Sequence, residues 1–198
     1  MSTPAENKVK FGLEKVYVAV ATIDPDDNTA TYDTPIAVPG ARSISLEPQG
    51  ELTEWYADNI AYYIVNNNQG YQGDLEVARF PDAVKAAIWG IATAGNGIRY
   101  EDADLAAVHF ALLFEFKGDS RKVRHVLYNC TATRPAISSA TTEDTTEPQT
   151  ETTTITARPI AATVASGTVK NVVRGDCAEG DDPYSSFYTA VTLPGAAG

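Results

Sequence analysis

"HFALLFEFKGDSRKVRHVLYNCTATRP", residues 109–135, contains the clearest strand pattern in the chain. Four large apolar side chains recur at every second position of its first half, as expected for one face of a β-strand: Phe110, Leu112, Phe114 and Phe116. The residues 118–120, GDS, are typical of a tight turn. β-branched and aromatic residues return after this turn. The pattern predicts an antiparallel hairpin.

Shorter segments of the same kind lie on both sides of this hairpin. Strands are expected near residues 15–23, 30–38, 42–48, 59–66, 73–80, 163–175 and 185–194. One segment, 81–90, has helix signals instead: Pro81 and Asp82 suit its first turn, and Gly90 suits its end. A series of strands with a single helix predicts a mainly β fold. We expect a β-sandwich or partial barrel with one flanking α-helix.

Charge and cysteine content reduce the number of functional classes to which the protein could belong. The net charge is −11 with a pI of about 4.5, so a surface that binds the phosphate backbone of nucleic acids is disfavoured. The two cysteines, Cys130 and Cys177, lack the spacing of a zinc site and are expected to be reduced thiols. No signal peptide or membrane span is recognisable. We expect a soluble protein made in a cytosol.

Catalytic motifs are missing from the sequence. His109 and His125 each fall in an expected strand, where a structural histidine is the simpler interpretation. Glu51 and Glu54 could be imagined as a pair of catalytic carboxylates, but any acidic protein offers such pairs. The segment 24–35 resembles a calcium loop without its glycine and its final glutamate. The sequence therefore predicts no enzyme, no metal site and no cofactor.

One segment, "TTEDTTEPQTETTTITA" at 141–157, does not fit a compact fold easily. As a strand it would carry Thr150, Thr152, Thr154 and Thr156 on one face. Its other face would carry Glu151, Thr153, Ile155 and Ala157, and we expect neither face to bury much against its own core. Three interpretations stay open: a strand completed by another copy of the chain, a disordered loop, or a glycosylated stalk.

Several stretches, in order along the chain from Asn7 to about Ala162, resemble the major tail proteins of long-tailed phages, of the φ13-type tail-tube family. They are "NKVKFGLEKVYVAV", "SLEPQGELTEWYADN", "NNQGYQGDLEVARFPDAVKAAIWG", "FALLFEFKGDSRKVRHVLYNCTATRP" and "EPQTETTTITARPIA". The resemblance implies a single tail-tube domain over residues 1–198. It also implies an N-terminal arm at 1–9 and a Thr/Glu-rich intersubunit arm or loop at 138–157.

The resemblance further implies a structural virion protein without catalysis. Copies of the chain would form hexameric rings that stack into the tail tube, through which phage DNA passes without specific binding. The expected partners are the chain itself and the tail tip or initiator, tape-measure and tail terminator proteins, with no membrane partner. The expected location is the virion tail, after assembly in the cytoplasm of a bacterial host.

Particular residues are candidates for these roles. A bore with the same charge as DNA would let the genome slide, and Glu51, Glu54 and Glu115 are the lumen candidates. The basic residues of the hairpin could contact acids of an adjacent subunit or could simply be solvated. The full set of intersubunit candidates is Thr150, Glu151, Thr152, Thr154, Ile155, Arg121, Lys122 and Arg124.

Two other functions remain as alternatives. The first is a β-sandwich that binds carbohydrate or mediates adhesion, with Tyr56, Tyr62, Tyr63 and Tyr71 as its platform. Core or interface packing of these tyrosines is the competing interpretation. The second alternative is a related secretion-system tube protein, which would share the ring architecture.

Overall fold

The computed structural model describes residues 12–50, 52–57, 60–137, 149–164 and 167–195, and for residues 52–57 and 60–66 it describes the backbone alone. Its centre is a nine-stranded antiparallel sheet with the path β2-β1-β10-β11-β12-β7-β4, to which β3 adds at β1 and β15 at β11. The strands are β1 (Leu13–Ile23), β2 (Ala30–Tyr32), β3 (Ile36–Ala37), β4 (Ala41–Gln49), β7 (Gly70–Val77), β10 (His109–Phe116), β11 (Arg124–Ala132), β12 (Glu151–Arg158) and β15 (Arg174–Cys177).

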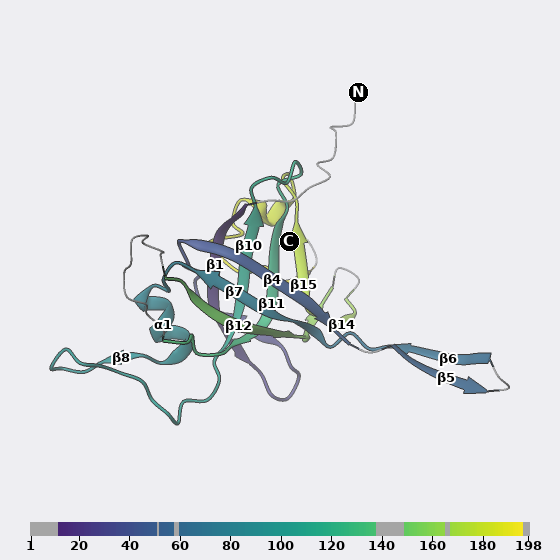
Figure 1. Cartoon of the computed structure of the whole chain (residues 1–198). Coiled ribbons are helices and arrows are strands. Elements are labelled where there is room, and N and C mark those ends of the chain that lie inside the picture. The colour runs from purple at the N-terminus through teal and green to yellow at the C-terminus, as the bar shows by residue number, and fades with distance from the viewer. Residues whose placement is uncertain (1–11, 51, 58–59, 138–148, 165–166, 196–198) are drawn as a thin grey trace, which may run out of the picture.

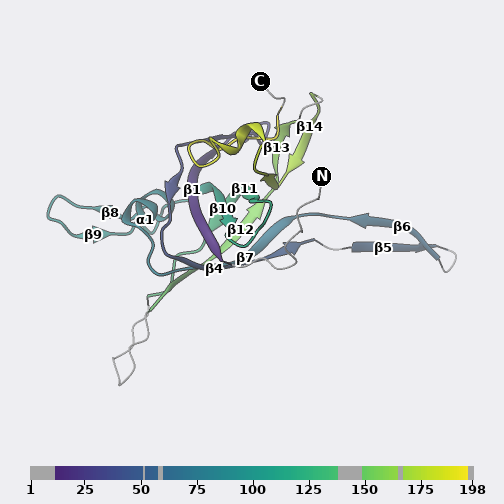
Figure 2. The same ribbon diagram turned by 90° about the horizontal axis from the view of Figure 1, so that it is seen from above.

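Smaller elements surround this main sheet (Figures 1 and 2). Three separate two-stranded sheets are β5 (Leu52–Ala57) with β6 (Ile60–Asn66), β8 (Ala92–Thr93) with β9 (Arg99–Tyr100), and β13 (Ile160–Thr163) with β14 (Val169–Val172). The helices are α1 (Asp82–Trp89) and the short 3-10 helix η1 (Asp182–Tyr184). Within the described residues, no helix has the length and apolar character needed to cross a membrane.

The expected hairpin is confirmed as β10 and β11, and it lies in the middle of the main sheet. Its register places Phe114 opposite His125 and Leu113 opposite Val126. Leu112 and Leu113 point to opposite faces, and both are buried. The hairpin therefore needs an apolar layer on each side.

The first layer is supplied by the sheet itself, which curves so that β12, β7 and β4 face β1, β10 and β11 (Figure 2). Leu75, Val77 and Ile155 meet Leu112 and Phe114 in this core. The curvature makes the fold a partial barrel, as the sequence predicts.

The single helix closes one end of this first core. α1 buries Val84, Ile88 and Trp89. Gly90 ends it in the left-handed region, with φ 62°, where a side chain would be strained. The helix predicted over 81–90 is thus confirmed with bounds one residue shorter at each end.

The second layer is supplied by the C-terminal part of the chain. Ile160, Cys177 and Phe187 are buried against Leu113, Val126 and other residues on the outer side of the hairpin. Residues 185–194, which we expected to form a strand, instead form turns after η1 that lie across this face. Their apolar residues cover the sheet without joining it, so their spacing was not evidence of a strand.

The Thr-rich segment is a strand of its own chain. β12 pairs with β11 on one edge, where Ala157 lies opposite Cys130. On its other edge it pairs with β7, where Ile155 lies opposite Gly73. Thr153 is 2% exposed, and Ile155 and Ala157 are each 1% exposed. The expected strand is confirmed, but the prediction that a neighbouring copy supplies its pairing and its core is wrong for residues 151–157. The rest of the expected arm, residues 138–148, lies outside the described residues.

Because only one face of β12 is buried, truncating side chains on its two faces should change the stability of the subunit by unequal amounts. Ile155→Ala should lower the free energy of unfolding by about 2–5 kcal/mol, because it leaves a cavity in the core. Thr152→Ala, on the exposed face, should change it by less than about 0.5 kcal/mol. Urea unfolding of the dilute subunit measures both. Equal, small effects would show that β12 does not belong to this core.

Candidate assembly surfaces

A long hairpin runs from the main sheet out into solvent. β4 pairs with β7, β5 pairs with β6, and the backbone N–H of Gln69 donates to the carbonyl of Gln49 at 2.8 Å between the two pairs. Gly50 is at this junction, where a Cβ would lie 1.9 Å from the carbonyl oxygen of Asn67. Residues 41–77 therefore form one continuous ribbon.

The distal half of this ribbon, residues 52–66, projects beyond the body (Figures 1 and 2). β5 and β6 pair only with each other among the described strands. Their sequences, LTEWYA and IAYYIVN, are rich in aromatic and β-branched residues. An isolated two-stranded hairpin is marginally stable in water, and no other described strand pairs with this segment.

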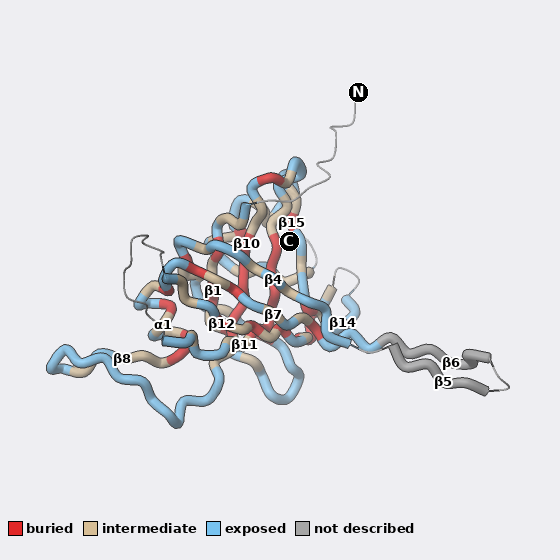
Figure 3. The backbone as a smooth tube through the Cα atoms, viewed as in Figure 1, coloured by how far each residue is buried: buried red, intermediate tan, exposed pale blue. Residues whose placement is uncertain are grey.

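The outer face of β4, β7 and β12 is entirely polar, and we call it the hydroxyl–acid face. It consists of Ser43, Ser45, Glu47, Gln72, Asp74, Glu76, Thr152, Thr154 and Thr156. Thr154 Oγ1 donates to Asp74 Oδ1 at 2.7 Å. Figure 3 shows the exposed positions along β4 and β7 on this side. Such a face presents hydroxyls and carboxylates with no apolar side chain.

Glu76 is the best-anchored acid of this face. Thr150 Oγ1 and Ser43 Oγ donate to its two carboxylate oxygens at 2.6 and 3.0 Å, and Arg42 forms an ion pair at 2.7 Å. Hydrogen bonds from Thr150 and Ser43 lower the pKa of Glu76. The carboxylate therefore keeps its negative charge.

Two of the intersubunit candidates of β12 point inward. The Ile155 side chain belongs to the core, so it is not an available contact. Glu151 accepts from Lys85 Nζ at 2.6 Å and from the backbone N–H of Phe80 at 2.8 Å. Burial raises the pKa of Glu151, but these two hydrogen bonds outweigh it and the pKa is lowered. Glu151 thus fastens α1 to the sheet.

Among the basic candidates, Arg124 also points into its own chain. Lys122 forms an ion pair with Glu179 at 2.7 Å on the surface, and Arg121 is exposed in the turn. Arg124, by contrast, binds Glu115 and lies against Tyr184, with 3.7 Å from its guanidinium carbon to the ring centroid. Contacts of Arg121, Lys122, Thr150, Thr152 and Thr154 with a neighbouring copy stay predictions.

Glu115, a lumen candidate, is the centre of a half-buried cluster within its own subunit, and its place relative to a lumen stays a prediction. It pairs with Lys15 at 2.7 Å and Arg124 at 3.0 Å, and it accepts from the Tyr188 hydroxyl at 3.0 Å. Tyr17 stacks on Tyr188. Burial raises the pKa of Glu115, but the hydrogen bonds from Lys15, Tyr188 and Arg124 outweigh it and the pKa is lowered. The cluster ties the C-terminal segment to the central hairpin.

Most of the remaining candidate residues lie outside the part of the chain that the structure describes, and Tyr71 lies within it. Glu51 and the arm at 1–9 lie outside the described residues, as do the side chains of Glu54, Tyr56, Tyr62 and Tyr63. Tyr71 packs partly buried against the first core, so it does not form an exposed binding platform.

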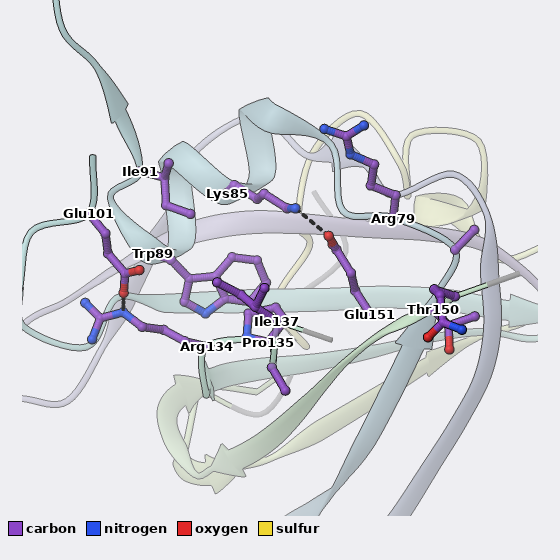
Figure 4. Close-up of a pocket in the computed structure, with 13 residues that line it drawn as sticks. Arg79, Lys85, Trp89, Ile91, Glu101, Arg134, Pro135, Ile137, Thr150 and Glu151 are labelled. Carbon is purple, nitrogen blue, oxygen red and sulfur yellow. Dashed lines mark hydrogen bonds and ion pairs between the residues drawn. The ribbon is translucent and has the colours of Figure 1, made fainter. Parts of the chain in front are cut away.

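Figure 4 shows a cavity of about 380 Å³ beside α1. Trp89, Ile91, Pro135 and Ile137 supply apolar walls, and the ion pairs Lys85–Glu151 and Arg134–Glu101 border it. Its lining contains no histidine, cysteine or serine that could act as a base or nucleophile. Within the part of the chain that the structure describes, no three His, Cys, Asp or Glu side chains gather as a metal site.

The Glu115 cluster predicts a pH-dependent contribution to stability. Because its folded-state pKa is lowered, the contribution is complete above the ordinary pKa of 4.5 and disappears as the pH falls through the folded-state value. Glu115→Gln should cost about 1–3 kcal/mol at pH 7. Urea unfolding across this pH range should show the variant and the original chain converging in acid.

Glu179→Gln is the matched control, because Glu179 forms an exposed ion pair with Lys122, and such a pair stabilises the fold by about 0–1 kcal/mol. If Glu115→Gln were no more costly at pH 7 than Glu179→Gln, Glu115 would not anchor the C-terminal segment.

Comparisons with known proteins show the family to which the chain belongs. The model of the family described as "Phage tail tube protein" matches residues 4–190. No curated protein sequence matches. A chain from the cryo-EM structure of the anti-feeding prophage (AFP) baseplate, 6-fold symmetrised, is similar with 10% identity and a TM-score of 0.40, covering 89% of this chain and 97% of that one. The family match spans nearly the whole sequence, and the chain therefore belongs to the phage tail tube proteins, which are non-enzymatic structural components of the virion tail.

Proposed function

We propose that copies of this chain close into hexameric rings and that the rings stack into the tube, with the hydroxyl–acid face toward the bore. The observation that carries the proposal is the projecting segment 52–66. Its strands pair only with each other among the described strands, and it extends past the body that would otherwise cover it. A second copy supplies the missing surface.

The free edge of the main sheet supports the same arrangement. β4 is the last strand of the path and pairs only with β7 among the described strands. An open edge presents unpaired backbone groups that another strand can join. Because β4 and the projecting segment are different surfaces of one molecule, contact between them is heterologous, and a heterologous contact closes into a ring when its rotation divides a full turn evenly.

The hydroxyl–acid face suits a passage for DNA. Asp74, Glu76 and Glu47 repel phosphates, and Arg42, a cation beside this face, is already paired with Glu76. No aromatic side chain on this face could stack on bases. A bore of this kind would let DNA slide without holding it, and the net charge of −11 agrees with this.

The finer assignments follow from the resemblance in sequence. Placement in the φ13-type group, and contacts with a tail tip or initiator, a tape-measure protein and a tail terminator, belong to this proposal. Thr150 and the Arg121–Lys122 turn are its candidate contact sites, whereas Thr152 and Thr154, which we also expected to contact a neighbouring copy, face the bore in this arrangement.

Removing the projecting segment tests the assembly. Replacing residues 51–66 by an Asn-Gly turn should leave the subunit folded, with Tm lowered by less than about 5 °C, because the segment pairs with no other described strand. The variant should form no tubes in negative-stain electron microscopy. Tubes of normal width from this variant would contradict the proposal.

A thiol placed on the hydroxyl–acid face tests the bore. Thr152→Cys should react with both a small maleimide and a polymer-linked maleimide in the free subunit, because Thr152 is exposed while Cys130 and Cys177 are buried. In assembled tubes only the small reagent should react at a comparable rate. Equal reaction with the polymer-linked reagent in tubes would place this face outside the bore.

A further inference from the structure

An apolar groove lies where the main sheet divides. β11 pairs with β15 through residues 124–127 and with β12 only through 129–132, so β15 and β7 are not joined. The groove between them has a volume of about 280 Å³. It is lined by Ile44, Leu46, Tyr71, Phe114, Phe116, His125, Leu127 and Arg174.

One polar atom in this groove lacks a partner among the described residues. His125 is 6% exposed, and its Nδ1 lies 2.6 Å from Asp176 Oδ1. A carboxylate only accepts hydrogen bonds, so Nδ1 carries the hydrogen, and in the neutral ring Nε2 has a lone pair. Nε2 is buried with no hydrogen-bond partner in the described part of the chain. The groove therefore fits an apolar side chain accompanied by an N–H or O–H donor.

We propose that Phe11 of the same chain fills this groove. The described chain begins at Gly12, whose carbonyl accepts from the backbone N–H of Lys117 at 2.8 Å. The next residue, Leu13, pairs with Phe116, which lines the groove. Residues 1–11 therefore start at the rim of the groove, and Phe11 is the first of them.

The chemistry of this segment matches the groove. Phe11 is apolar, and Val9 follows at the alternate position. Their backbone N–H groups supply the donor that His125 Nε2 needs. Gly12, with φ 74°, provides a bend that other residues adopt with strain.

A tether of one residue also favours the chain's own segment over a second copy. The effective concentration of Phe11 at the groove is in the millimolar range, which is the value for a short flexible linker. The inference concerns the isolated subunit and goes beyond the proposed tube. It leaves residues 1–9 able to reach a neighbour.

Disulfide trapping in dilute subunit tests the inference. Phe11→Cys with Leu46→Cys should form an intramolecular bridge on mild oxidation, seen as a monomer whose mass is lower by two hydrogen atoms and as a reductant-sensitive mobility shift. The matched control is Phe11→Cys with Ser45→Cys, because Ser45 is on the opposite face of β4 and should not link. No bridge, or a bridge only between two copies, would overturn the inference.

A second measurement does not depend on bridge geometry. Phe11→Ala should lower Tm by about 5 °C and increase binding of an apolar dye, while Lys10→Ala should do neither. Identical behaviour of the two variants would also overturn the inference. Electron microscopy of the same samples reports tube formation separately, so failure of the groove contact and failure of the tube proposal are distinguishable.

Discussion

The burial of the β10–β11 hairpin on both faces is the constraint on which the rest of the fold depends. Leu112 and Leu113 are adjacent in sequence and both are excluded from water. The sheet curves round to cover one side, and the C-terminal segment covers the other. The Glu115 cluster fastens that second cover, since Arg124 and Tyr188 come from the hairpin and the C-terminal segment respectively.

The same arrangement leaves parts of the molecule without partners. Curving toward β1 leaves β4 at an open edge, and the ribbon 41–77 runs away from the body, so its distal strands pair with no other described strand. An enzyme would expose a pocket with convergent reactive groups. The described residues present an open edge and a projecting ribbon, which are features that serve self-association, and a polar sheet face that we assign to the bore.

The sequence predicts the strands and the helix better than it predicts which distant residues pair with them and pack around them. The central hairpin was evident because its apolar alternation is strong, and α1 because its ends carry Pro81 and Gly90. β12 was recognised as a strand, but its inner face has only Thr153, Ile155 and Ala157, too little apolar surface to indicate a core position. Its place there depends on pairing with β11 and β7, which are distant in sequence. The surroundings of Glu115 could not be predicted for the same reason, because Lys15 and Tyr188 meet it only in the folded chain.

The most direct measurement of the central claim is a helical cryo-EM reconstruction of tubes assembled from the purified chain. The account predicts that the hydroxyl–acid face of β4, β7 and β12 lines the bore, and that residues 52–66 of each copy lie against the neighbouring copy. A reconstruction with this face on the outer wall, or with residues 52–66 in contact only with their own subunit, would contradict it.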